Sequence, residues 1–205
     1  MKVSRAQTGL NREALVTAAS RLFQAQGFAA TGVAQISEEA GLTQGGFYRH
    51  FKSKSLLAQA ACQQSLDRCH DEWVAMKGSG ADDLSTLIDA YVSAEHVDNV
   101  ADGCPMSAYT CEIKSQDAGT QQIFTLGFDD MTALLEETLV GDIAPEDARR
   151  IALFFMSSMV GSVALARATK RTDPQRSEQI LAATRDSLKA MAAHLRTAPP
   201  SDVAD

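Results

Sequence analysis

Apolar residues recur every three or four positions along nearly the whole chain, and no convincing stretch alternates between apolar and polar residues. Spacing of three or four places side chains on one face of an α-helix, whereas strict alternation would indicate a strand. A clear example is the stripe Cys62, Leu66, Cys69, Trp73 and Met76. With 45% hydrophobic residues in 205, the chain can bury a sizeable core. The pattern therefore predicts an all-α fold.

Turn-forming residues divide this pattern into nine expected helices. Gly27 and Gly41 are expected to end the first two, because glycine accepts the left-handed backbone that follows many helices. Thr43 and Ser53 are expected to cap the third and the fourth. Three prolines stand where a later helix is expected to begin: Pro105, Pro145 and Pro174. Residues 77–80 predict a hinge, and residues 197–205 are expected to fray.

Charge is distributed unevenly along the chain. The net charge is −7, yet residues 1–55 contain seven basic and three acidic side chains. Residues 56–205 contain twelve basic and 23 acidic side chains. A basic segment can approach phosphate, whereas an acidic one is repelled by it. We therefore predict two domains, residues 1–55 and residues 56–205, with different tasks.

The second and third expected helices are separated by residues 40–43 alone, which is the length of a helix-turn-helix. The third helix opens with Gly45 and Gly46, although each glycine costs about 1 kcal/mol against alanine inside a helix. A helix end without side chains can approach DNA closely, and Gln44 beside it can reach the edge of a base. This segment predicts a DNA-reading helix.

The same segments resemble the TetR family of transcriptional regulators, from Asn11 to about Leu57. The matching motifs are residues 18–23 (AASRLF), 27–31 (GFAAT), 36–42 (ISEEAGL) and 46–54 (GFYRHFKSK). The resemblance implies a nine-helix TetR-like architecture. Residues 1–55 would form a DNA-binding helix-turn-helix domain, and residues 56–205 a domain for ligand binding and dimerisation.

The resemblance also implies a homodimeric repressor whose third helices enter successive major grooves of a palindromic double-stranded DNA operator. By position, Gln44, Gly45 and Gly46 would meet bases, and the neighbouring polar residues would meet phosphates. The full set expected at DNA is Thr31, Gln35, Thr43, Gln44, Gly45, Gly46, Tyr48, Arg49, His50 and Lys54. Lys2 and Arg5 would add contacts from an N-terminal arm.

In the family, two helices near the C-terminus pack against their copies in a second subunit as a four-helix bundle. The expected dimer-interface residues are Met156, Met159, Val163, Leu181, Leu188 and Met191. The helix around residues 151–166 is apolar on nearly every side, so it must be covered on more than one face. The alternative for this helix is a central position inside one subunit.

An effector pocket is expected among the fourth to eighth helices, and effector binding would release the DNA. Its expected lining is Trp73, Tyr91, Cys104, Met106, Tyr109, Phe124, Phe128, Met131 and Phe155. Methionine and aromatic side chains favour a small apolar or aromatic effector. The alternative for each of these residues is an ordinary place in the core.

Cys104 supports a second hypothesis, a thiol-based repressor that senses oxidants or electrophiles. It directly precedes Pro105, and the positive end of a helix dipole lowers a thiol pKa. Cys62 and Cys69 are expected in the core. We expect no metal, no cofactor, no enzymatic activity and no membrane contact, and a cytoplasmic location. A sequence-indifferent architectural DNA-binding protein and a cysteine-dependent enzyme are the competing classes.

Overall fold

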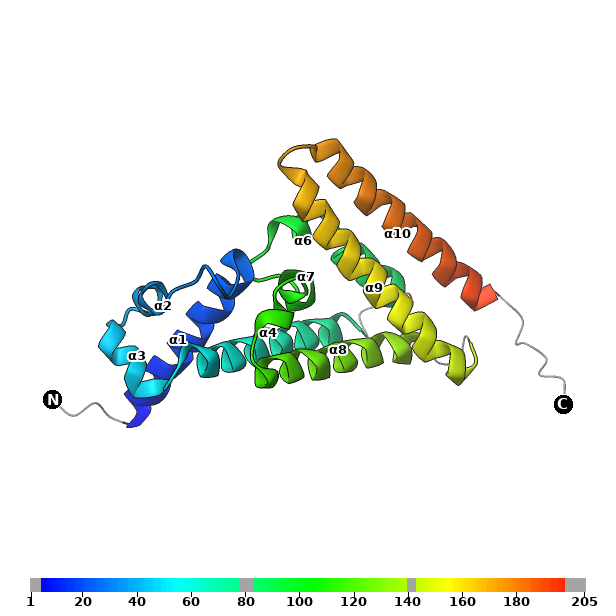
Figure 1. Cartoon of the computed structure of the whole chain (residues 1–205). Helices are drawn as coiled ribbons and strands as arrows, with labels where there is room; N and C mark the ends of the chain where they lie inside the picture. Colours follow the sequence, from blue (N-terminus) through cyan, green and yellow to red (C-terminus); the bar gives the residue numbers. More distant parts are fainter. Residues whose placement is uncertain (1–4, 78–82, 140–142, 198–205) are drawn as a thin grey trace. The chain divides into compact units, whose positions relative to one another are not determined.

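A computed structural model describes residues 5–77, 83–139 and 143–197. Within these residues the chain forms ten α-helices and one short 3₁₀ helix, η1 (Figure 1). Their bounds are α1 Arg5–Gln26, α2 Val33–Glu39, α3 Gln44–His50, α4 Lys54–Met76, α5 Asp83–Tyr91, α6 Ala94–Asp98, α7 Pro105–Tyr109, η1 Ile113–Ser115, α8 Ala118–Leu139, α9 Pro145–Lys170 and α10 Pro174–Thr197. The expected all-α fold is confirmed.

The expected caps and stops hold at most helix ends. Thr43 accepts a hydrogen bond from the Gly46 amide at 3.2 Å, and Ser53 accepts one from the Leu56 amide at 3.2 Å. Gly27 and Gly41 both have positive φ, at 85° and 68°. The three prolines each occupy the first residue of a helix. These local signals therefore fix where α3, α4, α7, α9 and α10 begin.

The expected number of helices is one short of the ten α-helices found in the described segments. The missed element is α6, a five-residue helix whose cap, Ser93, accepts a hydrogen bond from the His96 amide at 3.1 Å. The helix that begins at Pro105 ends at Tyr109, so Cys111 lies beyond it. Residues 78–80 of the expected hinge, residues 198–205 of the expected frayed end, and Lys2 lie outside the described residues.

Packing divides the chain into two compact units. Unit 1 comprises residues 1–69 and 100–127, and unit 2 comprises residues 70–99 and 128–205. The two units are defined by contacts within the fold, whereas the predicted domains were defined by function. The functional division at residue 55 remains a prediction.

Unit 1 is built around aromatic side chains from segments far apart in the sequence. The Phe28 ring lies 4.9 Å from Phe23 and 4.7 Å from Tyr109, measured between centroids. All three are almost fully buried, and so are Ile36 and Phe47. Burying one such side chain contributes roughly 1.5–3 kcal/mol. Unit 1 therefore joins α1–α3 to residues 100–117 through one core.

Unit 2 is organised on α9, which packs lengthwise along α10 (Figure 1). Its buried stripe includes Ala152, Phe155, Met159 and Val163, all without accessible surface. Polar contacts join both helices to their neighbours. Arg167 donates to the carbonyl oxygen of His96 at 2.7 Å, and further ion pairs are Arg149–Asp129, Lys170–Asp98 and Lys189–Asp89.

The apolar character of α9 bears on membranes as well. The stretch Asp147–Lys170 is long and apolar enough to cross a bilayer by length and composition, with a mean hydropathy of 1.7 in its most apolar window. Of that window, 44% is buried inside the structure, and a core helix of a soluble protein passes the same test. The pattern is weak support for a membrane span.

Candidate nucleic-acid interface

The short helix α3 has one apolar side that anchors it and one polar side that is exposed. Phe47 has no accessible surface, and its ring stacks on Phe51 with centroids 6.0 Å apart. Gln44, Gly45 and Arg49 are exposed, and 60% of Tyr48 is accessible. Because Phe47 holds the helix from below, the polar side is presented to solvent in one orientation.

The turn between α2 and α3 fixes the angle between these two helices. The Gly41 amide donates to the Glu38 carbonyl at 2.9 Å, and the Leu42 amide donates to the Ser37 carbonyl at 2.7 Å. This wrapping requires the positive φ of Gly41, which a side chain would strain. Ile36 on α2 is fully buried beneath the turn. The two helices thus form the predicted helix-turn-helix geometry.

Most residues expected at DNA are accessible. Thr43, Gln44, Gly45, Tyr48 and Arg49 are exposed, and Gln35, Gly46 and His50 are half-buried. An alanine Cβ at Gly45 would meet no atom nearer than 4.0 Å, and one at Gly46 none nearer than 3.5 Å. The packing of α3 therefore does not require glycine at either position, and their close approach to DNA remains a prediction.

Two of the expected DNA contacts have structural surroundings instead. Thr31 has no accessible surface, and its hydroxyl donates to the Gly27 carbonyl at 2.8 Å. The Lys54 ammonium donates to the Phe28 carbonyl and lies 5.9 Å from the Phe23 ring centroid. The Thr31 hydroxyl closes the α1–α2 turn, and the half-buried Lys54 holds the same turn. Both side chains therefore position this turn, and their contact with DNA remains a prediction.

Arg12 is a cation beside α3 that the sequence reasoning did not select. It is exposed on α1, and its guanidinium carbon lies 4.9 Å from the ring centroid of Phe51, the residue that ends α3. In the sequence it is a single arginine within a helix, and nothing there indicates its distance from residues 44–51. Only the packing of α1 against α3 brings it to this surface.

Two family models match the chain. Residues 15–61 match the model described as bacterial regulatory proteins of the tetR family, and residues 81–179 match the C-terminal domain described as LmrA/YxaF-like transcriptional regulators. The chain belongs to the TetR family of transcriptional regulators. The first model covers α2, α3 and the turn between them, so the site described above is the family's helix-turn-helix.

HTH-type transcriptional regulators resemble the chain over short segments. It is 44% identical over 52 residues to the HTH-type transcriptional regulator YerO of Bacillus subtilis (strain 168), covering 25% of this chain and 18% of YerO. It is 49% identical over 43 residues to LmrA of the same strain, covering 21% of this chain and 23% of LmrA. Both matches therefore span less than a quarter of the relative.

A solved structure matches almost the whole chain. A TetR transcriptional regulator from Chloroflexus aurantiacus J-10-FL is 25% identical, with a TM-score of 0.78, and the match covers 92% of this chain and 96% of that one. The TetR-like architecture therefore extends through both compact units and is not confined to the N-terminal helices.

The residues expected to line a TetR-type effector pocket are divided between the two units. Unit 1 contains Cys104, Met106, Tyr109 and Phe124, and unit 2 contains Trp73, Tyr91, Phe128, Met131 and Phe155. Phe124 and Phe128 are half-buried, and the other seven are buried. Trp73 and Tyr91 meet edge to face with centroids 5.7 Å apart. Seven of the nine residues are therefore part of the core of their unit, and the role of the set toward an effector remains a prediction.

The cysteines differ in exposure. Cys62, Cys69 and Cys104 are buried, as expected for the first two, and Cys111 is exposed. Burial raises the pKa of Cys62 to about 12, because it disfavours the thiolate. Cys104 occupies the N-cap position of α7 without a capping hydrogen bond from its side chain. Nothing in this setting supports Cys104 as an exposed thiolate. Among the described residues, no group of three or more histidine, cysteine or acidic side chains could hold a metal ion.

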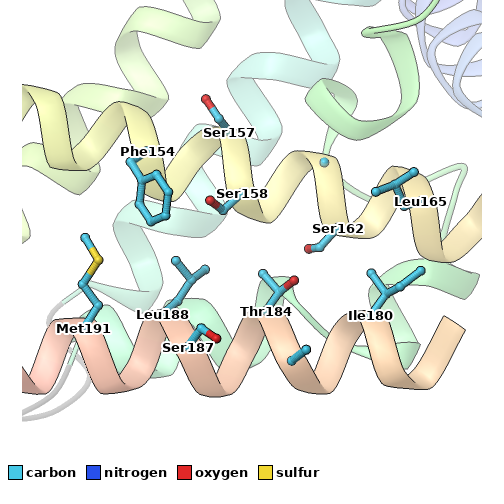
Figure 2. Close-up of a pocket in the computed structure, with 12 residues that line it drawn as sticks. Phe154, Ser157, Ser158, Ser162, Leu165, Ile180, Thr184, Ser187, Leu188 and Met191 are labelled. Carbon is cyan, nitrogen blue, oxygen red and sulfur yellow. The ribbon is translucent and has the colours of Figure 1, made fainter. Parts of the chain in front are cut away.

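The residues expected at the dimer interface lie largely inside their own chain. Met156, Met159 and Val163 have no accessible surface, and Leu181 and Leu188 are buried. A groove of about 570 Å³ runs beside them along α9 and α10 (Figure 2). It is lined by Phe154, Ser157, Ser158, Gly161, Ser162, Leu165, Ile180, Ala183, Thr184, Ser187, Leu188 and Met191. Of the residues expected at the dimer interface, Leu188 and Met191 line this groove, and the interface itself remains a prediction.

Proposed function

We propose that the chain is a dimeric transcriptional repressor that binds a palindromic DNA operator through α3. The observation that carries the proposal is the two-sided construction of α3. Buried Phe47 fixes its orientation, while Gln44, Gly45 and Tyr48 are exposed at its surface. Side chains of this kind can contact base edges and phosphates in a major groove.

The groove on α9 and α10 supports the dimer. Phe154 and Leu165 are 52% and 58% exposed, which is unusual for large apolar side chains on one face of a long helix. Between them lie Ser158, Gly161 and Ser162, small residues that allow another helix to approach closely. An interface related by a two-fold axis would place two copies of α3 on an operator with matching symmetry.

We propose further that a small apolar or aromatic effector releases the protein from DNA, and that the protein works in the cytoplasm and not as an enzyme. The methionine and aromatic side chains of both units support such an effector, because they can repack around an apolar guest. Release follows if the effector binds more tightly to a conformation in which the two α3 helices no longer fit the operator.

A selection of bound duplexes from random DNA tests the operator proposal. We expect enrichment of two inverted half-sites whose centres are about one helical turn or a multiple of it apart. Tyr48→Ala should weaken binding to every duplex, whereas Gln44→Ala should cost about 1–3 kcal/mol and relax the preference at one base position. A selection without symmetric enrichment would contradict the proposed operator.

A thermal-shift screen with uncharged aromatic and aliphatic compounds tests the effector proposal. A ligand at about 100 times its dissociation constant should stabilise the protein by about 2.7 kcal/mol. The same compound should lower the affinity for the selected duplex. Compounds that stabilise the protein and leave DNA binding unchanged would contradict effector release.

A further inference from the structure

The α2–α3 pair is held near both of its chain ends by one short segment, residues 112–117. Before α2, the Phe28 amide donates to Glu112 Oε2 at 2.9 Å. After α3, the Ser55 hydroxyl donates to Asp117 Oδ2 at 2.7 Å, and the Gln59 amide donates to Asp117 Oδ1 at 2.7 Å. The two carboxylates are five residues apart in the sequence, and the whole recognition motif lies between their partners.

Glu112 lies where a side chain of residue 27 would begin. A Cβ atom placed on Gly27 would lie 2.1 Å from Glu112 Oε1, a distance that non-bonded atoms do not reach. Gly27 also has a φ of 85°, which a side chain would strain. Glycine at this turn therefore serves two needs, the backbone conformation and the approach of the glutamate.

Asp117 is fixed to α8 as well as to α4. The Thr120 hydroxyl donates to Asp117 Oδ2 at 2.8 Å, and the amides of Gly119 and Thr120 donate to Oδ1 at 3.0 and 3.1 Å. Partial desolvation opposes ionisation of this carboxyl, but the hydrogen bonds from Ser55, Thr120 and Gln59 outweigh it and hold its pKa below the usual range. The carboxylate thus caps one helix while it holds the first turn of another.

Tyr109 anchors the start of this segment to the same core. Its ring lies 4.7 Å from the Phe28 ring, and its hydroxyl lies 3.3 Å from that of Ser65 on α4. The segment therefore has an apolar attachment to the α1–α2 turn beside its polar one. Both Glu112 and Asp117 lie outside residues 15–61, the part that matches the family's DNA-binding model.

We propose that Glu112 and Asp117 are positioning residues for DNA binding, which hold the helix-turn-helix at both ends so that α3 meets a major groove in one orientation. They act through Phe28, Ser55 and Gln59 and touch no nucleic acid themselves. The inference rests on the proposed operator binding.

Variants of Glu112 test the first contact, with a duplex recovered by selection with the wild-type protein as the probe. Glu112→Ala removes the acceptor and should weaken binding per active molecule by about tenfold. Because no phosphate contact is lost, the slope of affinity against salt concentration should stay unchanged. Exchange of the Phe28 amide hydrogen should become faster. Glu112→Gln retains an oxygen acceptor and should restore most of the affinity.

The matched control is Glu178→Ala, the same change of charge at an exposed position of α10. It should bind the duplex as the wild-type protein does. Loss of affinity in the control equal to that in Glu112→Ala would overturn the proposal, because net charge alone would then explain the effect. Wild-type affinity in Glu112→Ala would overturn it too.

If Glu112→Ala folds poorly, substitutions at residues that contact Glu112 and Asp117 test the proposal instead. Ser55→Ala combined with Gln59→Ala removes the second contact and leaves the cap of α8 intact, and it should also weaken binding by about tenfold. Gly27→Ala should cost more affinity in the wild-type background than in Glu112→Ala, because the second variant has no carboxylate to collide with the new Cβ. Purely additive effects of Gly27→Ala and Glu112→Ala on duplex binding would contradict the contact between these two residues.

A wild-type protein that selects no duplex would refute the proposed function. This outcome differs from those that refute the positioning roles of Glu112 and Asp117.

Discussion

Thr31 and Tyr48 are both polar side chains of the N-terminal region, and the fold gives them opposite surroundings. Thr31 is fully buried and its hydroxyl donates to the carbonyls of Leu22 and Gly27, whereas 60% of Tyr48 is exposed. From their positions in the motifs alone, both residues are predicted to contact phosphate. Burial distinguishes their surroundings, and it depends on how the α1–α2 turn packs on residues 109–112.

The environment of His96 predicts that the stability of the fold depends on pH. Burial lowers its pKa to about 4, although its Nδ1 lies 2.7 Å from the Tyr91 carbonyl, and the Arg167 charge lowers it further. An unfolded histidine takes up a proton below about pH 6.5, while the folded one does so only near pH 4. Between these values the unfolded state binds more protons, so stability must fall as the pH falls.

We expect this histidine to cost about 1–2 kcal/mol of stability between pH 7 and pH 5. His96→Asn keeps a donor group near the Tyr91 carbonyl and does not titrate, so its unfolding free energy should depend less on pH over that range. Urea unfolding at fixed protein concentration measures the difference. Identical pH profiles for wild type and His96→Asn would show that the folded pKa is not depressed.

At the scale of the element, Gly45 of α3 lets fold stability and DNA binding be tested separately. Gly45 has no positive φ, and an added Cβ would meet no atom nearer than 4.0 Å. Gly45→Ala should therefore stabilise the fold by about 0.5 kcal/mol through helix propensity. It should at the same time weaken duplex binding by about tenfold or more, because the methyl group faces the DNA.

Thermal unfolding and equilibrium binding of the same preparation measure both effects. Gly41→Ala is the contrasting variant, since its φ of 68° makes a side chain unfavourable and its stability should fall. If Gly45→Ala bound the selected duplex as tightly as the wild-type protein, the start of α3 would not approach DNA closely.

Helix boundaries with a local chemical cause could be predicted from the sequence. Thr43, Ser53 and the three prolines mark starts, and the structure confirms each of them. The helix α6 was not predicted, because its five residues are too few to show a periodicity. Arg12 beside Phe51 and Glu112 beside Gly27 could not be predicted either. Both pairs depend on packing between segments that are 39 and 85 residues apart in the sequence.

At the scale of the whole molecule, the groove on α9 and α10 predicts how two copies associate. The interface residues predicted from the sequence were apolar residues of α9 and α10, and the structure buries Met156, Met159 and Val163 of α9 inside the chain. Hydrophobicity alone cannot distinguish a residue that packs within its chain from one that meets a partner. Phe154 and Leu165 are exposed, so we expect them to be of the second kind.

Leu165→Glu should convert the protein to a monomer, because a partner would have to bury the new carboxylate without a matching charge. The control is Leu126→Glu on α8, where the leucine is 56% exposed, close to the 58% of Leu165. Sedimentation velocity at several concentrations distinguishes the two species. A Leu165→Glu protein that remains dimeric would place the interface on another face.

The proposed function requires that α3 reads base sequence in duplex DNA. The most direct test measures the dissociation constants of the wild-type protein for the selected duplex and for a duplex of equal length and composition with scrambled half-sites, both at the same physiological salt concentration. We expect the selected duplex to bind at least about a thousandfold more tightly. Equal affinities for the two duplexes would show that the protein binds phosphate alone and that α3 does not read base sequence.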